Sequence, residues 1–191
     1  TRLSFLGFGT MNGKDGKPFK TREGGVMRLE NLIADIDEEM FTKIVENRSV
    51  RDKDARDTAK IVGLAAIKYG DLSNQATKDY IFDVDRFTSF EGNTGPYILY
   101  TIVRIKSILN RYVEAGGNLE AGEILPASNG SEKNLMLQLS GFGSMIESAF
   151  EEKAPHKICA YIYEVSNAFN SFYHETKILS EENQAQKESY I

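Results

Sequence analysis

Apolar residues recur at helical spacing along most of the chain. They fall three or four positions apart over residues 29–45 and 52–69, and the spacing returns over residues 98–112, 135–150 and 158–172. A period near 3.6 places such residues on one face of a helix, so these five segments are predicted to be amphipathic helices. The apolar face of the second segment consists mostly of alanines, which predicts close packing against a neighbouring element.

The segment 98–112 has the clearest helical pattern. Thr94 is a good N-cap residue for it, Pro96 suits its first turn, and the pair Gly116-Gly117 ends it. Pro96 is therefore predicted to mark the boundary into a helical bundle. The predicted buried face is Ile98, Ile102, Ile105, Leu109 and Tyr112.

Other segments have weaker patterns. Residues 80–85 are predicted to form a short strand or an extended connector, and residues 118–134 a loop or a broken short helix. Gly141 and Gly143 weaken the helix predicted over 135–150. Residues 180–191 are predicted to be a polar tail that stops without a helix cap.

The first 28 residues differ from the rest in pattern and in charge. Leu3–Phe8 is predicted to be a strand, and the glycines after it favour loops between short strands over a helix. This segment has six basic and two acidic residues, a local charge of +4, within a 191-residue chain whose net charge is −5. The predicted fold class is mainly α, with a small glycine-rich, partly β segment followed by helices.

Composition excludes several classes of protein. The acidic total argues against a protein that coats duplex DNA, although a local basic surface stays possible. The single cysteine, Cys159, allows no internal disulfide and no cysteine zinc site, which favours the cytoplasm. No run reaches the 18 apolar residues of a membrane span, and no secretory leader is recognisable. His156 and His174 are too few for a zinc site, and Asp83 fits a cap or turn, so no metal ligand is predicted.

The basic loop departs from the two best-known phosphate motifs. Its glycines are spaced one residue too widely for G-x-G-x-x-G, and Gly16-Lys17 is followed by Pro18 where a Walker loop has Ser or Thr. Two lysines three positions apart, Lys17 and Lys20, can still close on a triphosphate and neutralise the leaving pyrophosphate. A solvated basic turn is the alternative interpretation.

Residues 7–22 resemble the signature-loop region of bacterial arginyl-tRNA synthetases, which are class I enzymes. Onto their KMSKS-type loop, Lys17 falls at the first lysine, Lys20 at the second and Thr21 at the terminal serine. Pro18 and Phe19 depart from the usual Met and Ser. The resemblance continues through residues 62–69, 79–83 and 89–97, and residues 155–173 are similar to the helical DALR-type anticodon-binding domain of these enzymes.

The resemblance implies three parts. Residues 1–28 would end the catalytic domain, residues 29–95 would form a stem-contact helical region, and residues 96–191 would form an incomplete anticodon-binding domain. The HIGH motif and arginine pocket of the family would precede Thr1, and its last helices would follow Ile191. The chain is therefore expected to be a fragment, in agreement with a first residue that is not Met.

The implied parent is an arginine–tRNA ligase, which activates arginine with ATP and transfers it to the 3′ end of its tRNA. Lys17 and Lys20 would be catalytic, and both would bind ATP together with Thr21. ATP would be a substrate accompanied by Mg²⁺, with no bound cofactor. The expected partners are the arginine tRNA, ATP and arginine, with no DNA and no membrane; the parent is expected to be a monomer, and the fragment is expected to be inactive alone.

The tRNA contacts are expected on two helices. Arg104, Lys106 and Arg111 are the only charged residues between positions 96 and 113, and all are basic, which suits phosphate contacts as well as a solvated helix face. Tyr173 falls, by resemblance, on a family tyrosine that contacts the anticodon loop, and aromatic rings are natural platforms for unstacked bases.

Two further residues complete the expected tRNA contacts. Tyr97 lies in the resembling segment 89–97, and Asn170 sits off the apolar face of its helix, where it would bind a base or water. Tyr161, Phe169 and Phe172 are predicted to pack in the core instead.

Two interpretations from other classes stay open. A stand-alone tRNA-binding module without catalysis would have an authentic start codon just before Thr1. A helical protein-interaction domain with an incidental basic loop would retain no RNA.

Overall fold

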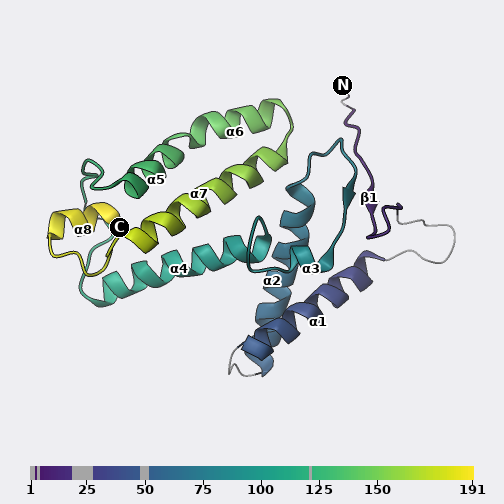
Figure 1. Ribbon diagram of the computed structural model, residues 1–191, viewed down its shortest axis with the longest axis horizontal. Helices are drawn as coiled ribbons and strands as arrows, with labels where there is room; N and C mark the ends of the chain where they lie inside the picture. Colours follow the sequence, from purple (N-terminus) through teal and green to yellow (C-terminus); the bar gives the residue numbers. More distant parts are fainter. Residues whose placement is uncertain (1–2, 4, 19–27, 48–51, 121) are drawn as a thin grey trace.

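The computed structural model describes residues 3, 5–18, 28–47, 52–120 and 122–191. Within these ranges the chain is mainly α, as predicted, and forms an elongated molecule with two strands of two residues each (Figure 1). The elements in chain order are β1 (Met11–Asn12), α1 (Leu29–Asn47), α2 (Asp52–Leu72), β2 (Tyr80–Ile81), α3 (Val84–Phe87), α4 (Gly95–Glu114), α5 (Gly130–Ser140), α6 (Phe142–Glu151), α7 (Pro155–Glu175) and α8 (Gln184–Tyr190).

The first half of the chain forms a head, which we define as β1, α1, α2, β2 and α3. Its core lies where α1 packs on α2, and the edge-to-face rings of Phe82 and Phe87 close it, with centroids 4.8 Å apart. The predicted small face of α2 is confirmed, since Ala55, Ala59 and Ala66 are almost fully buried. Small side chains let the neighbouring helices approach α2 closely.

The strand predicted at Leu3–Phe8 is wrong for the described residues of that segment. They form no strand, and Leu3, Phe5 and Phe8 are about nine-tenths exposed. A strand needs a partner for its backbone groups, and the described chain offers none there. The partner occurs further on, where β1 pairs in parallel with β2 in the register Met11–Tyr80 and Asn12–Ile81. β2 agrees with the short strand that was one of the two interpretations for residues 80–85, but only over Tyr80–Ile81, since Val84 already begins α3.

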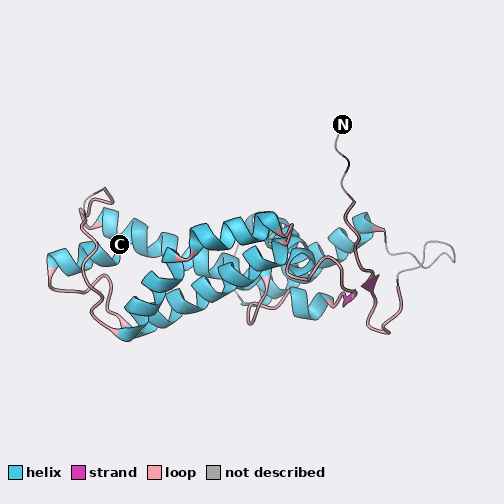
Figure 2. Cartoon of the chain, turned by 90° about the horizontal axis from the view of Figure 1, so that it is seen from above, coloured by secondary structure: helices cyan, strands magenta, loops and turns pink. Residues whose placement is uncertain are grey.

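The second half forms a bundle, which we define as α4 to α8. In this bundle α7 packs against α4, α5 and α6, and a second core gathers around Ile108, Phe172 and Ile178. The described part of the bundle consists of helices and loops, and both strands lie in the head (Figure 2). The helix start predicted at Thr94 is confirmed, because its side-chain oxygen accepts a hydrogen bond from the Tyr97 amide at 3.2 Å. None of the helices in the described ranges is both long and apolar enough to cross a membrane.

The buried face of α4 includes Ile98 and Tyr112, as predicted, but between them it is rotated from the predicted one. Thr101 and Ile108 are buried, whereas Ile102, which was predicted to be buried, is 41% exposed. The rotation brings Thr101 within hydrogen-bonding distance of Asn170 on α7, at 3.2 Å. A polar contact between α4 and α7 therefore accompanies the face of α4 that is buried, and apolar spacing alone did not predict this face.

Gly141 divides the helix predicted over 135–150 into α5 and α6. α5 also begins five residues earlier than the apolar pattern indicated, at Gly130, because Asn129 caps it by accepting a hydrogen bond from the Glu132 amide at 2.8 Å. The preceding residues that the structure describes form the predicted loop.

The tail over residues 180–191 is polar, as predicted, but it contains a helix that the sequence pattern did not predict. α8 occupies residues 184–190, and Asn183 caps it by accepting a hydrogen bond from the Gln186 amide at 3.2 Å. The Tyr190 ring lies edge-on to Phe172 with centroids 5.5 Å apart, and Ile191 packs on the same core. Two apolar residues at the end of the chain, rather than a helical period, dock this short helix.

Candidate nucleic-acid interface

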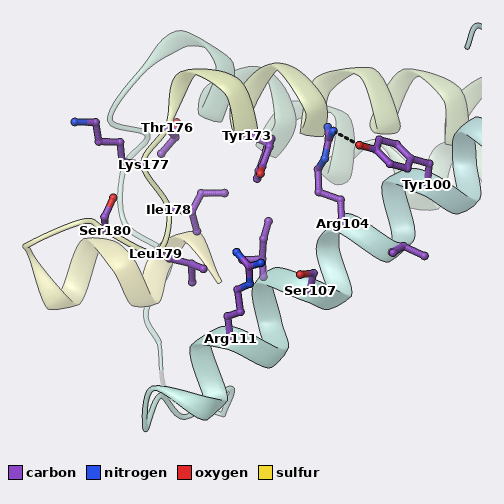
Figure 3. Close-up of a pocket in the computed structure, with 12 residues that line it drawn as sticks. Tyr100, Arg104, Ser107, Arg111, Tyr173, Thr176, Lys177, Ile178, Leu179 and Ser180 are labelled. Atoms are coloured by element: carbon purple, nitrogen blue, oxygen red, sulfur yellow. Dashed lines mark hydrogen bonds between the residues drawn. The ribbon is translucent and has the colours of Figure 1, made fainter. Parts of the chain in front are cut away.

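A groove of about 490 Å³ lies between α4 and the C-terminal end of α7, where the chain turns toward α8 (Figure 3). Arg104, Arg111 and Lys177 bring three cationic side chains to its wall, and no carboxylate side chain lines it. The full lining is Tyr100, Val103, Arg104, Ser107, Ile108, Arg111, Tyr173, Thr176, Lys177, Ile178, Leu179 and Ser180. Cations and hydroxyls without a competing carboxylate favour the binding of phosphate groups.

Arg104 lies between two aromatic rings at the mouth of the groove. Its guanidinium carbon is 4.8 Å from the centroid of Tyr100 and 4.6 Å from that of Tyr173, and Nη2 donates to the Tyr100 hydroxyl at 3.0 Å. The two tyrosines remain 44% and 38% exposed. Aromatic surface on both sides of the cation is thus open to an unstacked base.

Asn170 holds Arg104 from α7. Its Oδ1 accepts a hydrogen bond from Arg104 Nη1 at 2.5 Å, and its Nδ2 donates to the Tyr97 hydroxyl at 2.9 Å. Tyr97 in turn donates to Asn167 Oδ1 at 2.7 Å. The amide of Asn170 is therefore bonded to protein groups, and neither water nor a base is needed to satisfy it. The interpretation in which Asn170 reads a base directly gives way to one in which it positions Arg104.

The structure brings four of the six predicted tRNA-binding residues into one contact network: Tyr97, Arg104, Asn170 and Tyr173. Arg111 lines the same groove, whereas Lys106 is exposed on α4 and does not line it.

The groove is also lined by Tyr100 and Lys177, which the sequence pattern did not indicate. Tyr100 could have been found from its place one turn before Arg104, a spacing at which helical side chains meet. Lys177 lies just beyond the end of α7, and no spacing in the sequence indicates that it returns to α4.

The loop that bears Lys17 follows β1. The Gly13 amide donates to the Lys17 carbonyl at 2.9 Å, and the Gly16 amide donates to the Gly13 carbonyl at the same distance. Gly16 has a φ of +74°, which glycine adopts without strain. The Lys17 side chain is exposed at the end of this turn. Lys20 and Thr21 lie outside the described residues.

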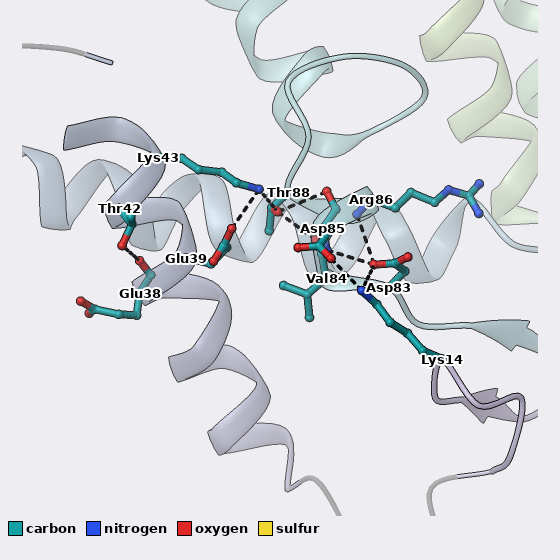
Figure 4. A network of polar contacts seen from close by, with 10 residues as sticks. All are labelled: Lys14, Glu38, Glu39, Thr42, Lys43, Asp83, Val84, Asp85, Arg86 and Thr88. Carbon is teal, nitrogen blue, oxygen red and sulfur yellow. Dashed lines mark hydrogen bonds and ion pairs between the residues drawn. The ribbon is translucent and has the colours of Figure 1, made fainter. Parts of the chain in front are cut away.

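Polar contacts tie the base of the loop to the segment after α2 (Figure 4). Lys14 Nζ lies 2.7 Å from Asp85 Oδ2 and 3.2 Å from Asp83 Oδ1, and the Thr10 amide donates to Asp79 Oδ1 at 2.7 Å. Asp83 also accepts a hydrogen bond from the Asp85 amide at the start of α3, which confirms the cap role weighed for it.

These contacts shift the acidities of the groups. The hydrogen bond with Asp85 raises the pKa of Lys14, and the same bond lowers the pKa of Asp85. The hydrogen bond from the Thr10 amide lowers the pKa of Asp79. A lowered folded-state pKa means that the contact stabilises the fold above the unfolded pKa of Asp, about 3.9, and that this stabilisation is lost as the pH falls through the folded value.

Replacing Lys14 by Met is expected to raise the pKa of Asp85 toward the ordinary Asp value, because its hydrogen-bonding cation is removed. A carboxyl-carbon NMR titration of both proteins measures the change. Asp79 is the internal control, since its partner is the Thr10 amide and its pKa should not move. An Asp85 titration unchanged by Lys14→Met would contradict the ion pair.

Candidate metal ligands do not cluster in the described ranges. No group of three or more His, Cys, Asp or Glu side chains there could hold a metal ion. Cys159 is free and buried, as expected for a small core residue, and burial raises the pKa of its thiol.

Two sequence families match the chain. The family described as tRNA synthetases class I (R), catalytic domain, matches residues 1–84, and the family described as DALR anticodon binding domain matches residues 98–189. The second match includes every residue that lines the groove.

Curated relatives align over the whole chain. An arginine–tRNA ligase of Agathobacter rectalis is 67% identical over 199 residues, which cover 100% of this chain and 33% of that protein. An arginine–tRNA ligase of Alkaliphilus oremlandii is 57% identical and covers 99% of the chain and 32% of its own length. The chain thus spans about a third of the length of the relatives it matches.

Solved structures share the fold. The arginyl-tRNA synthetase of Thermus thermophilus superposes with a TM-score of 0.81 at 22% identity, over 96% of this chain and 30% of that one. The arginyl-tRNA synthetase of Plasmodium falciparum superposes with a TM-score of 0.76 at 25% identity, over 97% of this chain and 30% of that one.

Proposed function

Because the chain belongs to the arginyl-tRNA synthetase family, we propose that it is the part of an arginine–tRNA ligase that binds tRNA and carries the ATP-phosphate loop. The complete enzyme would activate arginine with ATP and transfer it to the 3′ end of the arginine tRNA, in the cytoplasm and as a monomer. Residues 1–28 would end the catalytic domain, residues 29–95 would contact the tRNA stem, and residues 96–191 would bind the anticodon arm.

The groove beside Arg104 carries the tRNA-binding part of this proposal. A nucleotide there would stack its base on the Tyr100 or Tyr173 ring and place its phosphate near Arg111 and Lys177. Tyr97 and Asn170 would act by fixing the Arg104 guanidinium between the rings. Lys106 would contact a phosphate from outside the groove.

Binding of transcribed tRNA across a salt titration tests the proposal. We expect the chain to bind the arginine tRNA more tightly than an unrelated tRNA at every salt concentration, and both affinities to fall with salt, because counterions are released from phosphates. Fluorescence anisotropy with end-labelled tRNA measures both.

Three outcomes would contradict the proposal or favour another interpretation. Equal affinity for the two tRNAs would contradict recognition of the arginine tRNA. No retention of either tRNA would favour a helical protein-interaction domain. Tight, selective binding by a chain that never forms part of a ligase would favour the stand-alone module.

The ATP role is proposed for Lys17, Lys20 and Thr21. Lys17 lies on a turn that presents its ammonium group to solvent, where it can reach a phosphate chain. In the complete enzyme the lysines would neutralise charge on the leaving pyrophosphate, with Mg²⁺ arriving bound to ATP.

Lys17→Ala in the complete enzyme is expected to lower the rate of arginyl-adenylate formation by roughly 10- to 100-fold, since one cation is removed from the developing charge. Pyrophosphate exchange measures the rate. Affinity for tRNA should stay unchanged, because the turn lies on the head and the groove on the bundle. An unchanged exchange rate would remove Lys17 from the reaction.

A further inference from the structure

One phenol joins the head to the bundle. Tyr69, near the end of α2, has its hydroxyl 2.6 Å from Asn93 Oδ1, in the turn before α4, and 2.8 Å from the Cys159 carbonyl oxygen on α7. Both are acceptors, so the single phenolic hydrogen serves two elements of the chain that follow the head. Burial raises the pKa of Tyr69, and the group therefore stays protonated and able to donate.

Tyr69 lies where the head and the bundle are in contact. Beside it, the backbone of Gly95 packs so tightly on the carbonyl of Ala65 that a Cβ at Gly95 would lie 2.3 Å from that oxygen. Contacts between α2 and α4, and between α2 and α7, connect the head to the bundle at this point. Backbone packing fixes the separation of α2 and α4, and the Tyr69 hydroxyl adds a directional bond to α7.

α7, whose Cys159 carbonyl accepts the hydrogen bond from Tyr69, also forms one wall of the groove. α7 places Cys159 against Tyr69, Asn170 against Arg104, and Tyr173 in the wall of the groove. Between them the Tyr163 ring packs on Tyr97, with centroids 5.7 Å apart. Because α7 also packs against α4, which carries the other wall of the groove, we expect both walls to pivot together when the Tyr69 contact changes.

We propose that Tyr69 is a positioning residue that sets the angle between bundle and head, so that a tRNA held in the groove delivers its 3′ end to the catalytic domain. The inference rests on the proposed tRNA function. Loss of the hydroxyl removes the hydrogen bond between α2 and α7 but leaves their packing contacts and every residue of the groove in place. The bound tRNA is therefore retained, but its 3′ end is presented at a less favourable angle.

Tyr69→Phe in the complete enzyme tests this. The rate of arginine transfer under saturating tRNA, kcat, is expected to fall about tenfold, because orientation of the reacting groups depends on the joint. The Kd for tRNA is expected to stay within about twofold of the original, because the groove is intact. Single-turnover transfer and equilibrium anisotropy measure the two quantities.

Tyr80→Phe is the matched control. Tyr80 is a partly buried phenol that donates to Asp71 at 2.6 Å, burial raises its pKa in the same way, and both partners lie within the head. We expect a similar fall in the melting temperature for the two variants but a loss of kcat only in Tyr69→Phe.

An unchanged kcat in Tyr69→Phe, or an equal loss in both variants, would overturn the proposal. A parallel loss of tRNA affinity and kcat in Tyr69→Phe would overturn it too, by showing that the groove itself had changed. Failure of the unmodified enzyme to bind the arginine tRNA would instead overturn the proposed function.

Discussion

Arg104→Ala is expected to weaken tRNA binding about 30-fold, equivalent to about 2 kcal/mol. The substitution removes a cation that lies between two tyrosine rings and donates to Asn170 at 2.5 Å. It also leaves Asn170 Oδ1 without the Arg104 donor, so the contacts that link Asn170, Tyr100 and Tyr173 through Arg104 are lost. Anisotropy with the labelled arginine tRNA measures the change at one fixed salt concentration.

Two further variants separate the causes. Arg104→Lys keeps the charge but loses the planar guanidinium group, which stacks on the tyrosine rings and donates hydrogen bonds at the same time. It should therefore recover only part of the affinity. Lys106→Ala, on the same helix but outside the groove, removes a phosphate attraction alone and should weaken binding about threefold or less. Equal effects of Arg104→Ala and Lys106→Ala would contradict a binding site centred on the groove.

The sequence contained much of this site. The charged residues between positions 96 and 113 are all basic, which indicated Arg104 and Arg111, and the family resemblance indicated Tyr173. The role of Asn170 could not be predicted, because it depends on the rotation of α4 that brings Thr101, rather than Ile102, toward α7. Helical spacing alone cannot choose between two overlapping faces when a polar residue belongs to the buried one.

Elements of the fold were predictable where neighbouring residues determine them, and were not predictable where contacts between distant residues determine them. Thr94 and Pro96 specify the start of α4 with residues inside the turn itself, so the sequence was sufficient there. The strand expected at Leu3–Phe8 depended on a distant partner, and pairing occurs at β1 instead. α8 was missed because it is short and polar, and it is docked by Tyr190 and Ile191, which contact Phe172 and its neighbours far away in the sequence.

Gly95→Ala is expected to destabilise the protein by about 3 kcal/mol, at the upper end of the range for overpacked sites. A Cβ there would lie 2.3 Å from the Ala65 carbonyl oxygen, 2.6 Å from its carbon and 2.9 Å from the Ala66 nitrogen. These are backbone atoms inside α2, so no side chain can rotate away to make room. Urea unfolding followed by circular dichroism measures the loss as a lower midpoint.

Gly130→Ala supplies the matched comparison, because Gly130 is the first residue of α5 just as Gly95 is the first of α4. A Cβ at Gly130 would meet no heavy atom within 4 Å, and alanine is the better helix former, so stability should be unchanged or rise by up to about 1 kcal/mol. The difference between the two variants therefore isolates the contact between α4 and α2 from the general effect of replacing glycine. Equal stabilities for Gly95→Ala and Gly130→Ala would mean that α4 can move away from α2 freely, and a joint that yields so easily could not hold the bundle at a fixed angle to the head.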